Sequence, residues 1–181
     1  MRSRVASLVL LALLAFTASA QVGWLDQQGH PAADTDSRKS QEGFGGWVIV
    51  TSDADWKAKW ETPSSTVPKF SQATTVARGK QVFVLMFFAN PQLNPANEAN
   101  VACDINVVRP DGSVSTNQSN LVCFNGVLQG NPQMMYLSEP VIAFVGDPGD
   151  PAGEWVVRVT LKDNNRKVEV PLRASFFLVD K

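Results

Sequence analysis

Short apolar segments separated by turn residues run through the chain from residue 47 onward. In 101–109 and in 154–161 the large apolar side chains recur at every second position. This period of two is typical of a strand that buries one face. The predicted strands are 47–50, 81–89, 101–109, 114–118, 121–128, 135–137, 141–145, 154–161 and 168–179. Eight or nine short strands, with a turn roughly every 8 to 12 residues, predict an all-β protein built as an antiparallel β-sandwich.

The segment QVFVLMFFA at 81–89 breaks the alternation because every residue after Gln81 is apolar. Its two faces carry Phe83, Leu85 and Phe87 on one side and Val84, Met86 and Phe88 on the other. Leaving either face in water would cost several kcal/mol at about 25 cal/mol per Å² of apolar surface. We therefore expect both faces of this strand to be covered.

One helical pattern interrupts the strands at 53–60, where DADWKAKW is followed by Pro63. Trp56 and Trp60 are four residues apart and share one face of this short inserted helix. Ser52 or Asp53 is expected to cap its N-terminus. We expect the helix to cover the second face of the 81–89 strand. The alternative covers are the N-terminal tail and another chain, which would be either a second copy in a homodimer or a partner protein.

The first 20 residues have the three parts of a secretory signal peptide. Arg2 and Arg4 precede the apolar stretch VASLVLLALLAF, and Ala18-Ser19-Ala20 supplies small residues before a cleavage site at Gln21. The apolar stretch is shorter than the roughly 20 residues of a membrane span. We expect no membrane span after leader removal and a soluble protein in the periplasm or secreted. A short leader rich in Ala and Leu favours a bacterial source.

Residues 21–43 have few apolar side chains and no regular period, so they are expected to form a flexible N-terminal tail. The β-sandwich domain is predicted to occupy 44–181. Trp24 and Leu25 are the exceptions in the tail, and they are expected either to dock on the domain or to serve a partner.

Cys103 and Cys123 are the two cysteines of the chain. In an oxidising compartment two such thiols usually pair, so we predict a structural disulfide. Simple hairpin pairing sets Val108 opposite Val114, which would leave Cys103 opposite Ser119. The disulfide therefore requires a bulge near 117–120, or it joins strands across the sandwich.

The C-terminal part also carries a family resemblance. The segments INVVRPDGSV at 105–114 and PGDPAGEWVVRVTLKDNNRKVEVPLRASFFLV at 148–179 carry it. They resemble immunoglobulin-like or fibronectin-III-like domains of exported bacterial proteins, over about residues 80–180. The resemblance implies an immunoglobulin-like arrangement of the sandwich and says nothing of function.

Charge and residue counts exclude several classes of function. The chain has 16 basic and 17 acidic residues, and removal of Arg2 and Arg4 leaves 14 basic residues. This balance is not that of a nucleic-acid-binding protein. His30, the one imidazole, lies in the predicted tail, and no G-x-S-x-G or S-x-x-K motif occurs. We expect no enzyme and no cofactor.

Asp147, Asp150 and Glu154 are a weak calcium candidate because they offer hard oxygen ligands within eight residues. Their spacing fits no EF-hand, and Asp beside Pro or Gly is ordinary in turns. We interpret the segment as a turn and expect no metal.

Trp24, Trp56 and Trp60 are the candidate interface residues, since exposed Trp anchors protein interfaces and stacks on sugars. The sequence predicts a non-catalytic exported β-sandwich that binds another exported or envelope protein. The alternative is a carbohydrate-binding module. An exposed, coplanar Trp pair would favour the carbohydrate module, and a buried pair beside an apolar sheet patch would favour a protein partner.

The disulfide generates the first prediction. Thiol titration of the unreduced, denatured protein should find no free thiol, and two reactive thiols per chain would contradict the pairing. Replacing both cysteines with serine should lower the free energy of unfolding by about 2–4 kcal/mol in urea titrations, because the cross-link restricts the unfolded chain.

Overall fold

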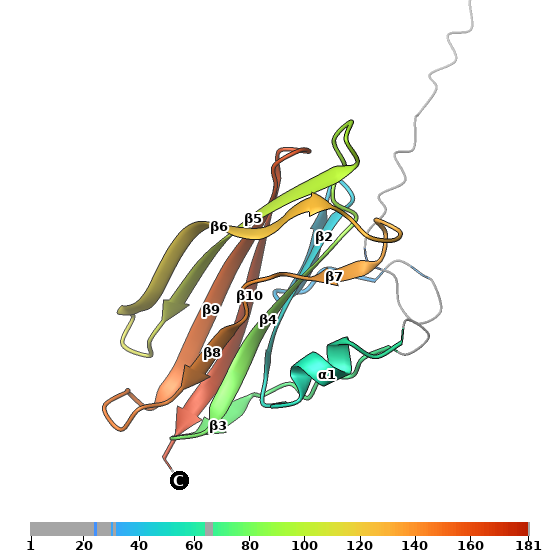
Figure 1. Ribbon diagram of the computed structural model, residues 1–181. Helices are drawn as coiled ribbons and strands as arrows, with labels where there is room; N and C mark the ends of the chain where they lie inside the picture. The colour runs from blue at the N-terminus through green and yellow to red at the C-terminus, as the bar shows by residue number, and fades with distance from the viewer. Residues whose placement is uncertain (1–23, 25–29, 31, 64–66, 181) are drawn as a thin grey trace, which may run out of the picture.

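The computed structural model describes residues 24, 30, 32–63 and 67–180, and the predicted signal peptide lies outside these residues. These described residues form two stacked five-stranded sheets and one short helix, which confirms the predicted all-β sandwich (Figure 1). Within the described residues, no helix has the length and apolar character needed to cross a membrane.

The first sheet has the strand order β1-β2-β4-β7, and β8 also pairs with β4. Its strands are β1 (Arg38–Gln41), β2 (Phe44–Thr51), β4 (Gln81–Ala89), β7 (Met135–Leu137) and β8 (Ile142–Val145). The second sheet has the order β3-β10-β9-β5-β6. Its strands are β3 (Thr75–Ala77), β5 (Glu98–Val108), β6 (Val114–Val127), β9 (Gly153–Asp163) and β10 (Val168–Val179). All pairs are antiparallel except β3 with β10.

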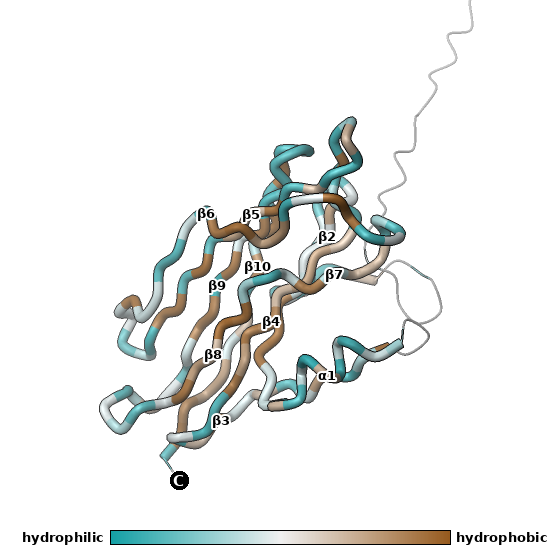
Figure 2. The backbone as a smooth tube through the Cα atoms, viewed as in Figure 1, coloured by the Kyte–Doolittle hydropathy of each residue, from teal (hydrophilic) through white to brown (hydrophobic). Residues whose placement is uncertain are grey.

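The core lies between the two sheets. Trp155 of β9 packs against Phe144 and Phe176, with ring centroids 4.8 and 6.3 Å away. Along β9 and β10 buried and more exposed residues alternate, and the tube in Figure 2 is brown over much of β4. A Cβ added to Gly46 of β2 would lie 2.9 Å from Leu161, so this glycine lets the two sheets approach closely.

Strand β6 is one continuous strand with three register shifts, where the sequence predicts two strands separated at 119–120. Val108 faces Val114 as predicted, but Cys103 faces Leu121. One shift lies between Cys103 and Ile105, opposite residues 118–121, and another makes Cys123 the extra residue beside Val122. The bulges therefore bring Cys123 close to Cys103, as the predicted bulge near 117–120 was required to do.

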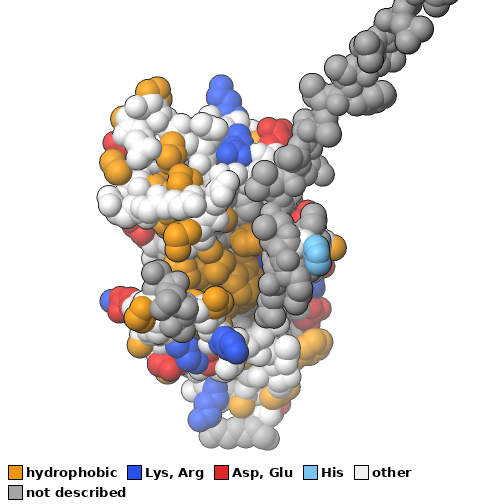
Figure 3. Space-filling model, turned by 90° about the vertical axis from the view of Figure 1, so that its right-hand side faces the viewer, with side chains coloured by type: hydrophobic (Ala, Val, Ile, Leu, Met, Phe, Trp, Pro, Cys, Tyr) orange, Lys and Arg blue, Asp and Glu red, His pale blue; other side chains and the backbone are white. Residues whose placement is uncertain are grey.

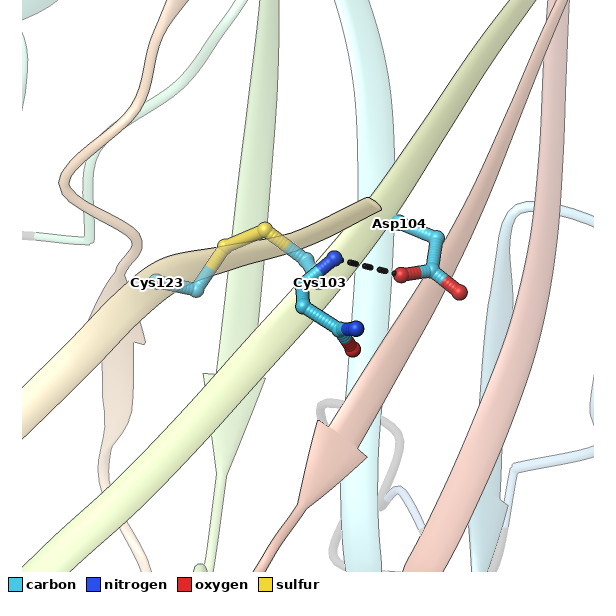
Figure 4. Close-up of a disulfide and its surroundings, with 4 residues drawn as sticks. Cys103, Asp104 and Cys123 are labelled. Carbon is cyan, nitrogen blue, oxygen red and sulfur yellow. Dashed lines mark hydrogen bonds between the residues drawn. A yellow bond between two sulfur atoms is a disulfide. The ribbon is translucent and has the colours of Figure 1, made fainter. Parts of the chain in front are cut away.

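The disulfide joins Cys103 of β5 and Cys123 of β6, which are adjacent strands of one sheet (Figure 4). Their Cα atoms are 5.9 Å apart and both side chains are fully buried. The Asn120 backbone N–H donates to the Asp104 carboxylate at 2.8 Å, and this bond holds the bulged part of β6 against β5. A disulfide such as Cys103–Cys123 is typical of oxidising, extracytoplasmic compartments.

The predicted boundary at residue 44 is wrong, because part of the 21–43 segment is folded. Strand β1 pairs with β2 over residues 38–41, and the Arg173 N–H donates to the Asp36 carbonyl. The β1 sequence RKSQ has no large apolar residue, so only backbone pairing reveals it.

Trp24 also docks on the domain. Its indole N–H donates to the Lys39 carbonyl at 2.9 Å, and the Arg38 guanidinium lies 5.9 Å from the ring centroid. A Cβ added to Gly45 would lie 3.1 Å from the indole, so the bare backbone at Gly45 makes room for the ring.

The docked N-terminal segment generates the second prediction. In urea titrations, a chain that begins at Gly43 should have a free energy of unfolding lower by about 2 kcal/mol or more than a chain that begins at Gln21, because it loses β1 and Trp24. A chain that begins at Asp34 keeps β1 and should fall between them. Equal midpoints for all three chains would show that the segment contributes nothing to the fold.

Candidate binding surface

The outward face of the first sheet is apolar, and we call it the outer apolar face. Its floor is Ile49, Leu85 and Phe87, all buried. Around the floor pack the partly buried side chains of Trp47, Trp56, Trp60, Phe70, Phe83, Met135, Leu137 and Val141. These eleven hydrophobic residues form a cluster separate from the core between the sheets.

The register of β2 and β4 builds this face. Trp47 pairs with Phe87, Ile49 with Leu85 and Thr51 with Phe83. Cross-strand partners point to the same side of a sheet, so the three pairs line up on the outward face. The Trp47 and Phe87 rings stack, with centroids 5.1 Å apart. The predicted second apolar face of the 81–89 strand is thus present, and β2 extends it.

Helix α1 (Trp56–Trp60) covers part of the face, as predicted. The Trp56 ring lies 6.0 Å from Phe83 and the Trp60 ring 5.4 Å from Phe87, tilted by 52° and 50° respectively. Phe70, from the loop after the helix, lies 5.8 Å from Phe87. The cover is therefore made by three aromatic rings that all contact β4.

The predicted helix start and cap are wrong. The helix begins at Trp56, its N-cap residue is Asp55, and that side chain makes no capping bond. Asp53 instead anchors the loop that follows: its carboxylate accepts from the Ser71 N–H at 2.8 Å and pairs with Lys59 at 2.8 Å.

Burial alone would raise the pKa of Asp53, but its bonds with Lys59 and Ser71 outweigh burial and hold the pKa below the ordinary value. Asp53 therefore stays ionised at neutral pH. The ionised carboxylate joins the start of the helix segment to the loop that carries Phe70.

The residues that the structure describes cover the outer apolar face only in part. Figure 3 shows a hollow whose visible floor is hydrophobic. At one end of the face is an open pocket of about 400 Å³, lined by Trp60, Thr62, Val67, Pro68, Met134, Met135 and Tyr136. Val67 and Met134 at its mouth are 79% and 49% exposed. The structure thus leaves large apolar side chains accessible beside a buried floor.

The candidate interface residues fall in one region. Trp56 and Trp60 lie on α1, and Trp24 packs over Gly45, two residues along β2 from Trp47 and on the same outward face. The sequence did not identify Phe70, Met135 or Tyr136 as part of this region. Phe70 is the lone aromatic residue in the Pro/Ser/Thr loop 62–73, which was the one available signal.

The carboxylates of the calcium candidate bond to neighbouring groups of the protein. Asp150 accepts from the Asp147 N–H at 3.0 Å within a turn, and Glu154 pairs with Arg173 at 2.8 Å. Among the described residues, no group of three or more His, Cys, Asp or Glu is placed to hold a metal ion.

Asp163 is fully buried, and its carboxylate holds backbone segments together. It accepts from the backbone N–H groups of Gln92, Asn165 and Arg166, at 2.7 to 3.2 Å. These bonds tie the β9–β10 turn to the segment after β4. The carboxylate is therefore occupied by backbone groups.

Comparisons with known proteins add no function. No protein-family model and no curated protein matches the sequence. Among solved structures, a family 123 glycoside hydrolase from Clostridium perfringens is similar over 75% of this chain and 28% of that chain, with 7% identity and a TM-score of 0.41.

Two further structures are similar at comparable distance. The alkylpurine DNA glycosylase AlkC of Pseudomonas fluorescens, bound to DNA with an abasic site analog, has 15% identity over 58% of this chain and 27% of that chain, with a TM-score of 0.37. A Niemann-Pick type C2 protein from Japanese carpenter ant has 10% identity over 74% of this chain and 89% of that chain, with a TM-score of 0.31. The chain spans less than a third of the first two proteins.

The aromatic cover generates the third prediction. Trp60→Ala and Trp56→Ala should each lower the free energy of unfolding by about 3 kcal/mol, because each removes a ring that packs on β4. Val67→Ala, at an exposed position, should change it by less than about 0.5 kcal/mol. Urea titrations measure all three. If both Trp variants unfold like the unchanged protein, α1 does not stabilise the sheet.

Proposed function

We propose that this protein is a non-catalytic, exported β-sandwich that binds another exported or envelope protein through the outer apolar face. The observation that carries the proposal is that the described residues cover that face only in part. A monomeric domain normally hides such a surface, and an apolar patch that stays accessible marks an interaction site.

The residue types of the face support a protein partner. Trp, Phe, Tyr and Met are enriched at the centres of protein interfaces, where charged residues are depleted. Trp47, Trp60 and Met135 belong to the face, and Tyr136 lines the adjoining pocket. Buried Phe87 beneath them gives a rigid floor, which reduces the ordering cost of binding.

Export rests on two features that agree. The first 20 residues have the pattern of a cleaved signal peptide. The buried Cys103–Cys123 disulfide requires an oxidising environment to form. We infer that the mature protein acts in the bacterial periplasm or outside the cell.

A carbohydrate-binding function is the alternative, and the ring geometry favours it less. Sugar-binding modules present Trp rings flat to the solvent. Here Trp56 and Trp60 are each half-buried, and their rings tilt against Phe83 and Phe87. The pair is therefore used largely to cover the sheet.

The fourth prediction tests the proposal with a photo-reactive amino acid placed at Met134, beside the face, in cells that export the protein. Irradiation should give one protein adduct of defined mass, because a partner bound on the face lies within reach. The matched control places the same group at Val122, which is 61% exposed on β6 of the other sheet. The control should give no such adduct.

A second substitution makes the experiment specific. Val67→Asp adds a charge at an exposed position of the pocket that adjoins the face and should remove the Met134 adduct. No adduct from Met134, or the same adduct from Val122, would overturn the proposal. An adduct of twice the chain mass would identify the partner as a second copy. Binding to a glycan array that Val67→Asp abolishes, without a protein adduct, would establish the carbohydrate alternative.

A further inference from the structure

The pocket at the end of the outer apolar face has the size of a ligand site. Its volume of about 400 Å³ falls in the range of roughly 300–1,000 Å³ that small-molecule sites occupy. Trp60 and Thr62 form one wall, Val67 and Pro68 another, and Met134, Met135 and Tyr136 the third. These walls come from the end of α1, the loop after it and the β7 segment.

The hydroxyl groups that line the pocket donate to the protein itself. The Tyr136 hydroxyl lies 2.8 Å from the Asn131 carbonyl and 3.1 Å from that of Gln129. Thr62 donates to the Lys59 carbonyl at 2.9 Å. None of the lining side chains that the structure describes is charged at neutral pH. Among the lining residues that the structure describes, the side chains therefore offer a ligand no ionic group and no spare hydroxyl proton.

The remaining walls suit a hydrocarbon group. Met134 and Met135 are flexible thioethers that adapt to irregular apolar shapes. Trp60 and Tyr136 supply flat apolar surfaces. The pocket is open on one side, where exposed Val67 and Met134 border the solvent. A ligand could thus bury an apolar end and leave a polar end in water.

We propose that this pocket binds the hydrocarbon part of a small amphiphile, with the polar end of the ligand directed into solvent. The ligand class is a molecule that carries an aliphatic chain or an aromatic ring. Because none of the described lining side chains is charged, recognition depends on the apolar part of the ligand and not on the charge of its headgroup. This inference does not require the protein partner, since purified protein suffices to test it.

The fifth prediction uses N-phenyl-1-naphthylamine, a dye that fluoresces when it leaves water, with the purified mature protein. The dye should bind saturably at one site per chain. Excitation of tryptophan should also excite the dye, because Trp60 forms a wall of the pocket. Trp60→Phe should reduce this energy transfer while direct excitation still reports bound dye.

Matched charge substitutions locate the site. Val67→Glu and Met134→Glu should each weaken dye binding by about tenfold or more, because a charge then faces the apolar ligand. Both positions are exposed, so the variants should fold, and urea titrations confirm that. Val122→Glu, at a comparably exposed position on β6, should change binding less than about twofold. Equal weakening by all three variants, or no saturable binding, would overturn the proposal.

Competition tests the ligand class. Dodecanol, dodecanoate and dodecylammonium, each below its micelle concentration, should displace the dye with affinities within roughly tenfold of one another, because none meets a charged wall. If only one of the three headgroup types displaced the dye, the proposal of an uncharged pocket would be overturned. Because these assays contain no second protein, their failure is separate from failure of the cross-linking experiment.

Discussion

Strand β4 must be covered on both faces, and this constraint shapes the rest of the molecule. Its inward side chains pack against the second sheet, as in any sandwich. Its outward side chains need a cover that a two-layer fold does not provide. The segment between β2 and β3 supplies that cover, with two Trp residues on α1 and Phe70 after it. The Asp53 carboxylate holds the segment in place through Ser71 and Lys59.

The segments that cover β4 and β2 also bound the outer apolar face. Trp24 sits over Gly45 toward one end of β2, and α1 lies over Phe83 and Phe87. Between these covers the sheet stays apolar, and the pocket opens beside β7. A patch bounded in this way offers a defined shape to a ligand or partner, whereas an unbounded apolar sheet would favour non-specific association.

Periodicity predicted the parts of this structure that depend on local sequence. The bounds of β4, β7 and β10 match those expected, because their apolar side chains mark them directly. Export chemistry predicted the Cys103–Cys123 pair. Strand β1 could not be predicted, since RKSQ has no apolar pattern and its stability comes from backbone bonds to β2.

The candidate site was predicted only in part for a similar reason. Trp56 and Trp60 are visible as a helical pair, and the doubly apolar strand shows that they have a surface to cover. Met135 and Tyr136 reach the same region because β7 pairs with the far end of β4. That pairing is separated by nearly 50 residues in sequence, and no local pattern indicates it.

The bulges of β6 have a consequence for self-assembly. This strand is the last of its sheet, is 14 residues long and contains neither a charged residue nor a proline. A flat edge of that composition would act as a template for strands of other molecules. Three register shifts interrupt its row of outward backbone groups, and the disulfide fixes one of them at Cys123. Because an irregular edge is a poor template for a further strand, the disulfide constrains the edge of this sheet as well as the unfolded chain.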